Sequence, residues 1–445
     1  MQPIVAQVSP NDEQRPAVLD RGRDVVVTAG AGTGKTRTLV ARYLSLLAEG
    51  VPLRAIVAIT FTRKAAREMR NRIRAELQTF LAGADLSGAE RQRWDALYGQ
   101  LDAARIGTIH NLCTEILRAH PAEMSLDPRF DVLDEGQGGL LRQESVDEAL
   151  AWAADDAQAV LLFSFLGERR LRSLLESLMG QRLEAAAAFD GLPEPLWPQW
   201  QAKIVAPIKA FVDDPALMTM FSDLAALKAD GTLSRAAARG DKLARPLATL
   251  LDLWSQIQAA RKRGDWPGVA ACLRPLRANM KQVGRKDNWS PAEPKVIIKE
   301  LQKLYDENVA GFVGKEGINL SLDQQMAGLM PVLGQLFERA NDAYLARKRV
   351  AGALDFDDLE ALALELLQNH PAARQRWQNE VAAILVDEFQ DTNSRQRDLV
   401  KLINGERGKL FIVGDAKQSI YRFRGAEVTV FREERAKIED GGGAS

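Results

Sequence analysis

The chain has 445 residues, more than one compact core usually accommodates, so two or three domains are expected. Its 46% hydrophobic and 27% charged residues are typical of a soluble globular protein. The formal net charge of −1 excludes a uniformly basic coat for nucleic acid, so any site for a polyanion must be a local patch.

Cysteine usage and the apolar stretches predict a cytoplasmic protein that makes no membrane contact. Cys113 and Cys272 are too few for a disulfide framework and indicate a reducing compartment. The start, MQPIVAQVSPNDEQ, lacks the basic region and apolar run of a secretion signal. The longest apolar stretches, such as AVLLFSFL, are far shorter than a membrane span.

Four short apolar runs predict buried parallel strands. They are rich in Val and Ile, do not alternate with polar residues, and end in small or acidic residues. The runs are DVVVTAG (24–30), AIVAITF (55–61), AAILVDE (382–388) and KLFIVGD (409–415). Helical patterns follow the first two. This rhythm predicts an α/β fold with a doubly wound parallel sheet, which binds ligands at the carboxyl ends of its strands.

The segment AGAGTGKT (29–36) follows the first predicted strand and opens the first predicted helix. Its glycines let backbone N–H groups approach phosphate, Lys35 can reach the outer phosphates, and the Thr36 hydroxyl can bind Mg²⁺. The strict pattern begins with Gly, whereas this segment begins with Ala29. A chance glycine-rich turn is the alternative, but the strand before it and the helix after it favour a P-loop.

The segment TFTRKAAREMRNRI (60–73) follows the second predicted strand and carries a basic stripe at helical spacing. The stripe comprises Arg63, Arg67, Arg70 and Arg74. It could bind a phosphate backbone while Phe61 stacks on a base, or it could be a solvated face. Further along, GTIHNLC (107–113) places Thr108 and His110 after another expected strand, where His110 has a functional or a structural reading.

From about 121 to 350 the alternation of strands and helices disappears. Helical patterns rich in Ala and Leu dominate, and six of the eight tryptophans lie here. The pattern predicts a helical domain, 121–350, inserted between two parts of the sheet domain, 1–120 and 351–445. The last residues, EDGGGAS, are expected to be the start of a linker or a cut end.

The segment FDDL (356–359) gathers three carboxylates, those of Asp355, Asp357 and Asp358. A second metal site is one interpretation. A helix N-cap region is the favoured one, because acidic side chains are stabilised at that end of the helix dipole.

Two acids end the third predicted strand, in ILVDEFQDTN (384–393). Adjacent acids are usually a solvated turn, but a strand this apolar does not tolerate charge without a function. Beside a P-loop, Asp387 could hold Mg²⁺ and Glu388 could polarise the attacking water. The fourth predicted strand leads into VGDAKQSIYRFRGAE (413–427), whose long polar and aromatic side chains are unusual in a strand-to-helix loop.

Seven segments occur in a fixed order: NDEQRPAV, AGAGTGKT, TFTRKAAREM, GTIHNLC, LDFDDL, VDEFQDTN and GDAKQSIYRFRGAE. Through them the chain resembles the UvrD/Rep family of superfamily 1 DNA helicases and, within it, the AddA/RecB-like branch. The resemblance covers roughly 8–135 and 350–430, and it extends to the helical insert only in position. It implies a RecA-like P-loop fold with ATP and Mg²⁺ as cofactors.

The resemblance also implies roles for single residues. Gln14 would read the adenine edge, Arg37 would flank the adenine, and Gln418 would sense the γ-phosphate. The nucleotide-binding residues would be Gln14, Ala29, Gly30, Gly32, Thr33, Gly34, Lys35, Thr36 and Arg37. The catalytic residues would be Lys35, Asp387, Glu388 and Gln418, with Thr36 and Asp387 on the metal. The DNA-binding residues would be Phe61, Thr62, Arg63, Thr108, His110, Tyr421 and Phe423. Relatives often carry Trp in place of Phe423.

The implied function is the ATP- and single-stranded-DNA-binding amino-terminal half of an ATP-dependent 3′–5′ DNA helicase or translocase, in recombination or double-strand-break repair. Its substrate would be single-stranded DNA or a duplex with a single-stranded end, and a helicase–nuclease partner subunit is expected. The family's second RecA-like half supplies an arginine to the γ-phosphate, and nothing after Phe431 matches it. We therefore expect near-background hydrolysis from this chain alone. The alternative is a non-catalytic ATP-gated DNA-binding or interaction module.

Overall fold

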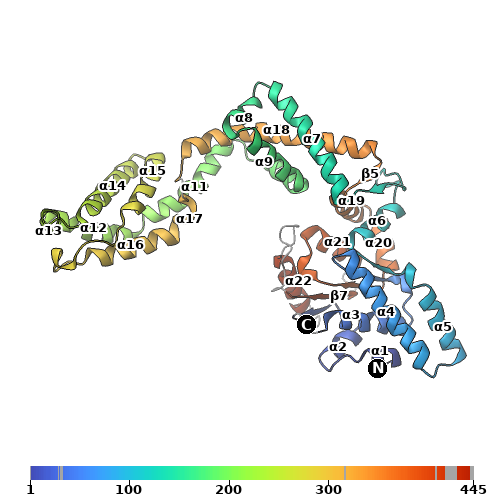
Figure 1. Cartoon of the computed structure of the whole chain (residues 1–445). Coiled ribbons are helices and arrows are strands. Elements are labelled where there is room, and N and C mark those ends of the chain that lie inside the picture. The colour runs from blue at the N-terminus through green and yellow to red at the C-terminus, as the bar shows by residue number, and fades with distance from the viewer. Residues whose placement is uncertain are drawn as a thin grey trace. The chain divides into compact units, whose positions relative to one another are not determined.

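The computed structural model describes residues 2–28, 30, 34–314, 317–405, 408–415 and 428–440. Contacts divide the chain into two compact units. Figure 1 colours the chain by residue number, so the unit built from both ends of the chain carries the blue and the red ends of the scale. The sheet unit comprises 1–141 and 345–445, and the helical unit comprises 142–344. The protein is therefore mixed α/β, mostly helical, and built around a parallel sheet.

The sheet unit holds a five-stranded parallel sheet within the described residues, in the order β1–β7–β6–β2–β3. Its strands are β1 (Val25–Thr28), β7 (Leu410–Gly414), β6 (Ala383–Val386), β2 (Ile56–Ile59) and β3 (Arg105–Gly107). Every residue of β2, β6 and β7 is buried, which is why these strands read as continuous apolar runs. The predicted parallel sheet is confirmed.

Two cores lie on opposite faces of this sheet, because neighbouring residues of a strand point to opposite sides. Val25 joins one core and Val26 the other, and Phe411 and Ile412 divide in the same way. The first core is closed by α1 (Pro3–Val8), α2 (Gln14–Leu19), α3 (Lys35–Ala48), α4 (Arg63–Gly83) and α5 (Gly88–Gly99). The second is closed by α6 (Ile109–Ala119), α19 (Phe356–Asn369), α20 (Pro371–Glu380), α21 (Ser394–Asn404) and α22 (Val428–Asp440).

The helical unit contains no strand among its described residues. Helix α7 (Glu135–Asp155) leads into it and α18 (Leu320–Val350) leads out. Between them lie α8 (Val160–Leu166), α9 (Glu168–Gly180), α10 (Arg182–Asp190), α11 (Leu196–Val212), α12 (Pro215–Ala229), α13 (Thr232–Ala238), α14 (Ala244–Lys262), α15 (Trp266–Asn279), α16 (Pro294–Asn308) and α17 (Ala310–Val313). Its core includes the buried rings of Phe221 and Trp289, and Phe221 stacks on Trp254 with centroids 4.2 Å apart.

The boundary expected at residue 121 lies instead between Leu141 and Arg142. The intervening residues stay with the sheet unit for two reasons. Phe130 is buried in its second core, and β4 (Asp131–Val132) pairs in parallel with β5 (Ala353–Leu354). Pairing between such distant segments leaves no local pattern in the sequence.

In the described parts of the chain no single helix is both long and apolar enough to cross a membrane. Helices α7 and α8 meet that criterion of length and composition only as a pair, and the pair is bent by 102°.

Two of the three carboxylates around FDDL, those of Asp355 and Asp358, are held by a buried lysine. The Lys348 side chain is 3% exposed and forms ion pairs with Asp355, at 2.9 Å, and with Asp358. Asp355 is the N-cap of α19: its side chain accepts from the Asp358 N–H at 2.8 Å, and the Asp358 side chain accepts from the Asp355 N–H at 3.1 Å. The N-cap interpretation is therefore confirmed. Among the described residues no three His, Cys, Asp or Glu side chains form a group that could hold a metal.

We expect Lys348→Met to lower the free energy of unfolding by about 3–5 kcal/mol, because it leaves two buried carboxylates without their cation. Lys64→Met is the matched control, since the Lys64 side chain is 87% exposed and lies 4.0 Å from Glu68. Its effect should stay within about 0.5 kcal/mol. Urea unfolding followed by circular dichroism measures both, and similar losses in the two variants would contradict a structural role for Lys348.

Candidate active site at the carboxyl edge of the sheet

The ends of the parallel strands meet at one edge of the sheet, and most of the predicted site residues follow those ends. Lys35 begins α3 after β1, and Glu388 follows β6. The two are 353 positions apart in the sequence, yet Lys35 Nζ lies 2.8 Å from Glu388 Oε2. The fold thus brings Lys35 of the glycine-rich segment into contact with one residue of the acidic pair.

Glu388 is held in an unusual conformation by a glutamine that sequence analysis missed. Its φ of 51° lies in the left-handed region, which is uncommon for a residue with a side chain. Gln390 Nε2 donates to Glu388 Oε2 at 2.7 Å, and Gln390 Oε1 accepts from the Asp415 N–H at 2.9 Å. A Cβ on Gly414 would lie 2.8 Å from that Oε1, so glycine leaves room for the amide. Gln390 therefore ties the Glu388 loop to the end of β7.

Asp387 lies directly after β6, and its N–H donates to the Ile59 carbonyl at 2.9 Å. Burial and then the charge of Glu388 raise the pKa of Asp387 to about 6, although Lys35 acts in the opposite direction. The same two causes raise the pKa of Asp391 to about 6. Both carboxyls therefore lie where the charged form is short of compensating positive charge, and a bound cation would stabilise it.

The residues expected at the adenine meet at the start of α3. Gly34 has a φ of +92°, which favours glycine, and a Cβ there would lie 3.1 Å from Gln14 Nε2. Arg37 Nη2 donates to Gln14 Oε1 at 3.3 Å, and the Asn11 N–H donates to the same oxygen at 3.2 Å. The Gln14 amide is thus held above the glycine that precedes Lys35.

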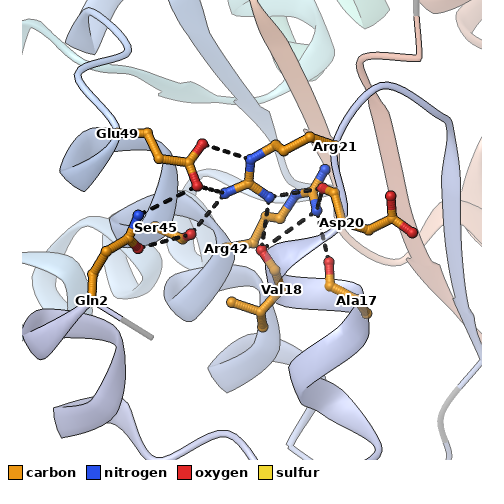
Figure 2. A network of polar contacts seen from close by, with 8 residues as sticks. All are labelled: Gln2, Ala17, Val18, Asp20, Arg21, Arg42, Ser45 and Glu49. Atoms are coloured by element: carbon orange, nitrogen blue, oxygen red, sulfur yellow. Dashed lines mark hydrogen bonds and ion pairs between the residues drawn. The ribbon is translucent and has the colours of Figure 1, made fainter.

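Figure 2 shows how the helix that carries Gln14 is attached to α3. Arg42 of α3 is 3% exposed, and its Nη1 donates to the carbonyl of Ala17 at 2.8 Å and to that of Asp20. Arg21 donates to the Asp20 carbonyl at 2.8 Å and makes two bonds to Glu49, at 2.8 and 2.9 Å. The last carbonyls of a helix lack hydrogen-bond donors within the helix, and here the guanidinium groups of Arg42 and Arg21 act as the donors. Burial lowers the pKa of Arg42 to about 10.

Two threonines cap the helices that follow β2 and β3. The Thr62 side chain accepts from the Ala65 N–H at 3.0 Å at the start of α4, and the Thr108 N–H donates to Asn111 Oδ1 at 3.1 Å at the start of α6. Thr62 is exposed, whereas Phe61 is partly buried. Both helix starts lie at the same edge as Lys35 and Glu388.

The predicted basic stripe divides into two pairs. Arg63 and Arg67 are exposed. Arg70 Nη2 donates to the Ile106 carbonyl of β3 at 2.8 Å, and Arg74 Nη2 lies 2.6 Å from a neighbouring carboxylate. A hollow of about 410 Å³ opens between α4 and β3, and arginines including Arg63, Arg67 and Arg70 line it.

His110 makes contacts within the protein. Its Nε2 lies 3.0 Å from Glu360 Oε1, and its ring stacks on Phe356 with centroids 4.4 Å apart. The side chain is 27% exposed. The structural reading of His110 thus has direct support.

Six of the predicted site residues lie outside the described residues. They are Ala29, Gly32, Thr33, Gln418, Tyr421 and Phe423.

The fold and these contacts define a mixed α/β protein whose parallel sheet carries a lysine–carboxylate site at its carboxyl edge. The sequence model of the family described as UvrD/REP helicase N-terminal domain matches residues 10–245 and 269–439, and the chain belongs to this family. The resemblance noted in the sequence is confirmed.

Curated relatives include proteins named as subunits of an ATP-dependent helicase/nuclease. The one from Levilactobacillus brevis is 32% identical over 458 residues, which cover 95% of this chain and 35% of the relative. The one from Heliobacterium modesticaldum is 30% identical, with 95% of this chain and 33% of the relative covered. The one from Staphylococcus aureus is 27% identical, with 97% and 37% covered. The chain thus spans about a third of the length of these relatives.

The raised pKa of Asp387 predicts a pH-dependent stability. Between pH values near 3.8 and about 6 the folded protein keeps a proton that the unfolded chain has lost, so stability falls as the pH rises through this window. Asp387→Asn should reduce this decline and raise the free energy of unfolding above pH 6 by on the order of 2 kcal/mol. Unfolding with EDTA and without nucleotide measures it. Asp12→Asn, at a side chain that is 93% exposed, should leave the profile unchanged, and identical profiles for both variants would refute the prediction.

Proposed function

We propose that this chain is the ATP- and single-stranded-DNA-binding amino-terminal half of an ATP-dependent 3′–5′ DNA helicase or translocase, acting in recombination or double-strand-break repair. The contact between Lys35 and Glu388 is the observation that carries this proposal, because ATP hydrolysis needs a cation for the phosphates beside a base for water. Membership of the helicase family and the names of the relatives support it. In this proposal the sheet unit is a RecA-like P-loop domain, and the helical unit is its insert.

Each residue of the nucleotide site has a separate task in this proposal. Gln14 and Arg37 would recognise adenine, and Thr36 and Asp387 would hold Mg²⁺, which neutralises phosphate charge when bound. Lys35 would exchange its bond to Glu388 for bonds to phosphate oxygens. Glu388 would then be available to orient the attacking water and accept its proton.

Gln390 is suited to hold the Glu388 carboxylate during this exchange. Its amide donates to Glu388 and accepts from the backbone after β7, so the carboxylate keeps one partner when Lys35 leaves. The proposed catalytic residue Gln418 follows β7 as well, so Gln390 links two parts of the proposed site.

We propose that single-stranded DNA lies along the ends of β2 and β3. Exposed Arg63 and Arg67 would contact phosphates, Thr62 and Thr108 would contact the backbone, and the ring of Phe61 would stack on a base. The remaining proposed DNA contacts are His110, Tyr421 and Phe423.

The names of the relatives describe each of them as one subunit of a helicase/nuclease. We propose a partner subunit for this protein, with single-stranded DNA or a duplex with a single-stranded end as its substrate. The family's γ-phosphate arginine belongs to a second RecA-like half, and such an arginine is typically worth about 10³- to 10⁵-fold in rate. These 445 residues alone should therefore hydrolyse ATP near background.

Nucleotide binding tests the proposal. Lys35→Ala should weaken binding of both ATP–Mg²⁺ and GTP–Mg²⁺ by about 10- to 100-fold, because a charged hydrogen-bond donor to phosphate is lost. Gln14→Ala should weaken ATP selectively, because its amide would read the adenine edge. Gln7→Ala is the control, since this amide bonds Glu76 on α4. Titration calorimetry separates these outcomes, and equal losses for ATP and GTP in the Gln14 variant would exclude it from base recognition.

DNA binding tests the second half of the proposal. Arg67→Ala should reduce the salt slope of oligothymidylate binding by up to about one unit, because one phosphate contact is lost. Arg91→Ala on α5 is the control: this exposed arginine donates to the Leu81 carbonyl and lies outside the hollow. Fluorescence anisotropy across salt concentrations gives both slopes. A slope that is unchanged in the Arg67 variant would place the DNA elsewhere.

A further inference from the structure

One buried carboxylate, that of Glu360, contacts residues from two of the sequence segments, GTIHNLC and VDEFQDTN. The Glu360 side chain, on α19, is 5% exposed. Its Oε1 lies 3.0 Å from His110 Nε2 and accepts from Gln396 Nε2 at 2.5 Å. Its Oε2 accepts from Asn393 Nδ2 at 3.1 Å and lies 3.8 Å from Arg395 Nε. Polar groups therefore surround both oxygens.

These partners come from two different places along the same carboxyl edge of the sheet. His110 lies in the first turn of α6, the helix that follows β3, and is one of the proposed DNA contacts. Asn393 is the N-cap of α21 and ends the segment that carries Asp387 and Glu388 after β6. In the sheet, β2 lies between β3 and β6, so Glu360 contacts residues that follow two strands which are not neighbours.

The bonds keep this carboxylate charged inside the protein. Burial opposes its ionisation, but hydrogen bonds from His110, Gln396 and Asn393 hold the pKa of Glu360 below its usual value. A buried charge is stable only while its hydrogen-bond partners stay in place. A shift of one partner therefore changes the strength of the bonds that the other partners make to the same carboxylate. Asn393 Oδ1 also accepts from the backbone N–H of Gln396 at 2.8 Å, which ties the Asn393 side chain to the first turn of α21.

Helix α19, which carries Glu360, is held firmly in the sheet unit. Asp355 and Asp358 at its start are tied to the buried Lys348, and the helix packs on both α6 and α21. The Glu360 carboxylate is therefore carried by a helix that is held at its start and on two faces, which keeps it between His110 and Asn393.

We propose that Glu360 is a positioning residue that couples the proposed DNA site to the proposed nucleotide site. The inference rests on the proposed function. DNA that engages His110 would change the bond between His110 and Glu360, and the amides of Asn393 and Gln396 would transmit that change to the loop with Asp387 and Glu388. Binding of one ligand then alters the affinity for the other by the same factor in both directions.

The test measures this factor in the 445-residue chain. The dissociation constant of ATP–Mg²⁺ is determined with and without saturating oligothymidylate, and that of oligothymidylate with and without saturating ATP–Mg²⁺. The wild-type chain should show a factor of about five or more in both directions. Glu360→Gln should bind each ligand alone within about threefold of wild type and lower the factor to about one, because a neutral amide binds these donors more weakly.

Two further variants make the result decisive. Glu365→Gln changes an exposed carboxylate on the same helix and should keep the wild-type factor. Gln396→Met removes one donor and leaves the charge, so it should lower the factor even where Glu360→Gln fails to fold. A factor that stays at the wild-type value in a folded Glu360 or Gln396 variant would overturn the inference alone, as would a wild-type factor of one. A wild-type chain that binds neither ATP nor oligothymidylate would overturn the proposed function as well.

Discussion

Parallel pairing between distant parts of the chain is the constraint on which the candidate site depends. The strand β6 lies between β7 and β2, and its register sets Val386 opposite Ile59. Because every pairing in this sheet is parallel, the residues after each strand reach the same edge. A slip of one residue would move Asp387 by about 3.3 Å and turn the strand's side chains to the wrong faces. The contact between Lys35 and Glu388 is therefore a consequence of sheet register.

Buried charged side chains help to attach two of the surrounding helices, α2 and α19. Helix α2 has six residues and buries Val18 fully, while Ala17 and Leu19 pack against the core only in part, so its apolar attachment is small. Bonds from Arg42 to its last carbonyls supply the missing attachment. Lys348 and Glu360 act comparably at the start and on the face of α19. Burying such groups is costly unless they are paired, so each pairing restricts how the helix that carries it can be placed.

Much of the fold and part of the site could be predicted because their signals are local. Continuous apolar runs predict strands covered on both faces, and the acidic side chains around FDDL predict a helix N-cap region. The buried polar residues Gln390, Arg42 and Glu360 were missed, because nothing beside them in the sequence shows their partners. Arg42 leaves one trace, a charge within the apolar run of α3. The expected boundary at residue 121 differs from the one in the structure for the same reason, since β4 pairs with β5, which is distant in the sequence.

The sequence by itself determined the family, the parallel sheet and the order of chemical segments, because apolar periodicity, glycine placement and strand-end acids act over a few residues. The tertiary structure decided which of these residues work together. Helical spacing predicted four arginines on one face of a helix. In the structure Arg70 donates to the Ile106 carbonyl of β3, whereas Arg67 is exposed to solvent. Likewise, burial beside Glu388 raises the pKa of Asp387, and the hydrogen-bond partners of Glu360 lower the pKa of that buried carboxylate. These outcomes depend on distance and dielectric between groups that only the folded chain brings together.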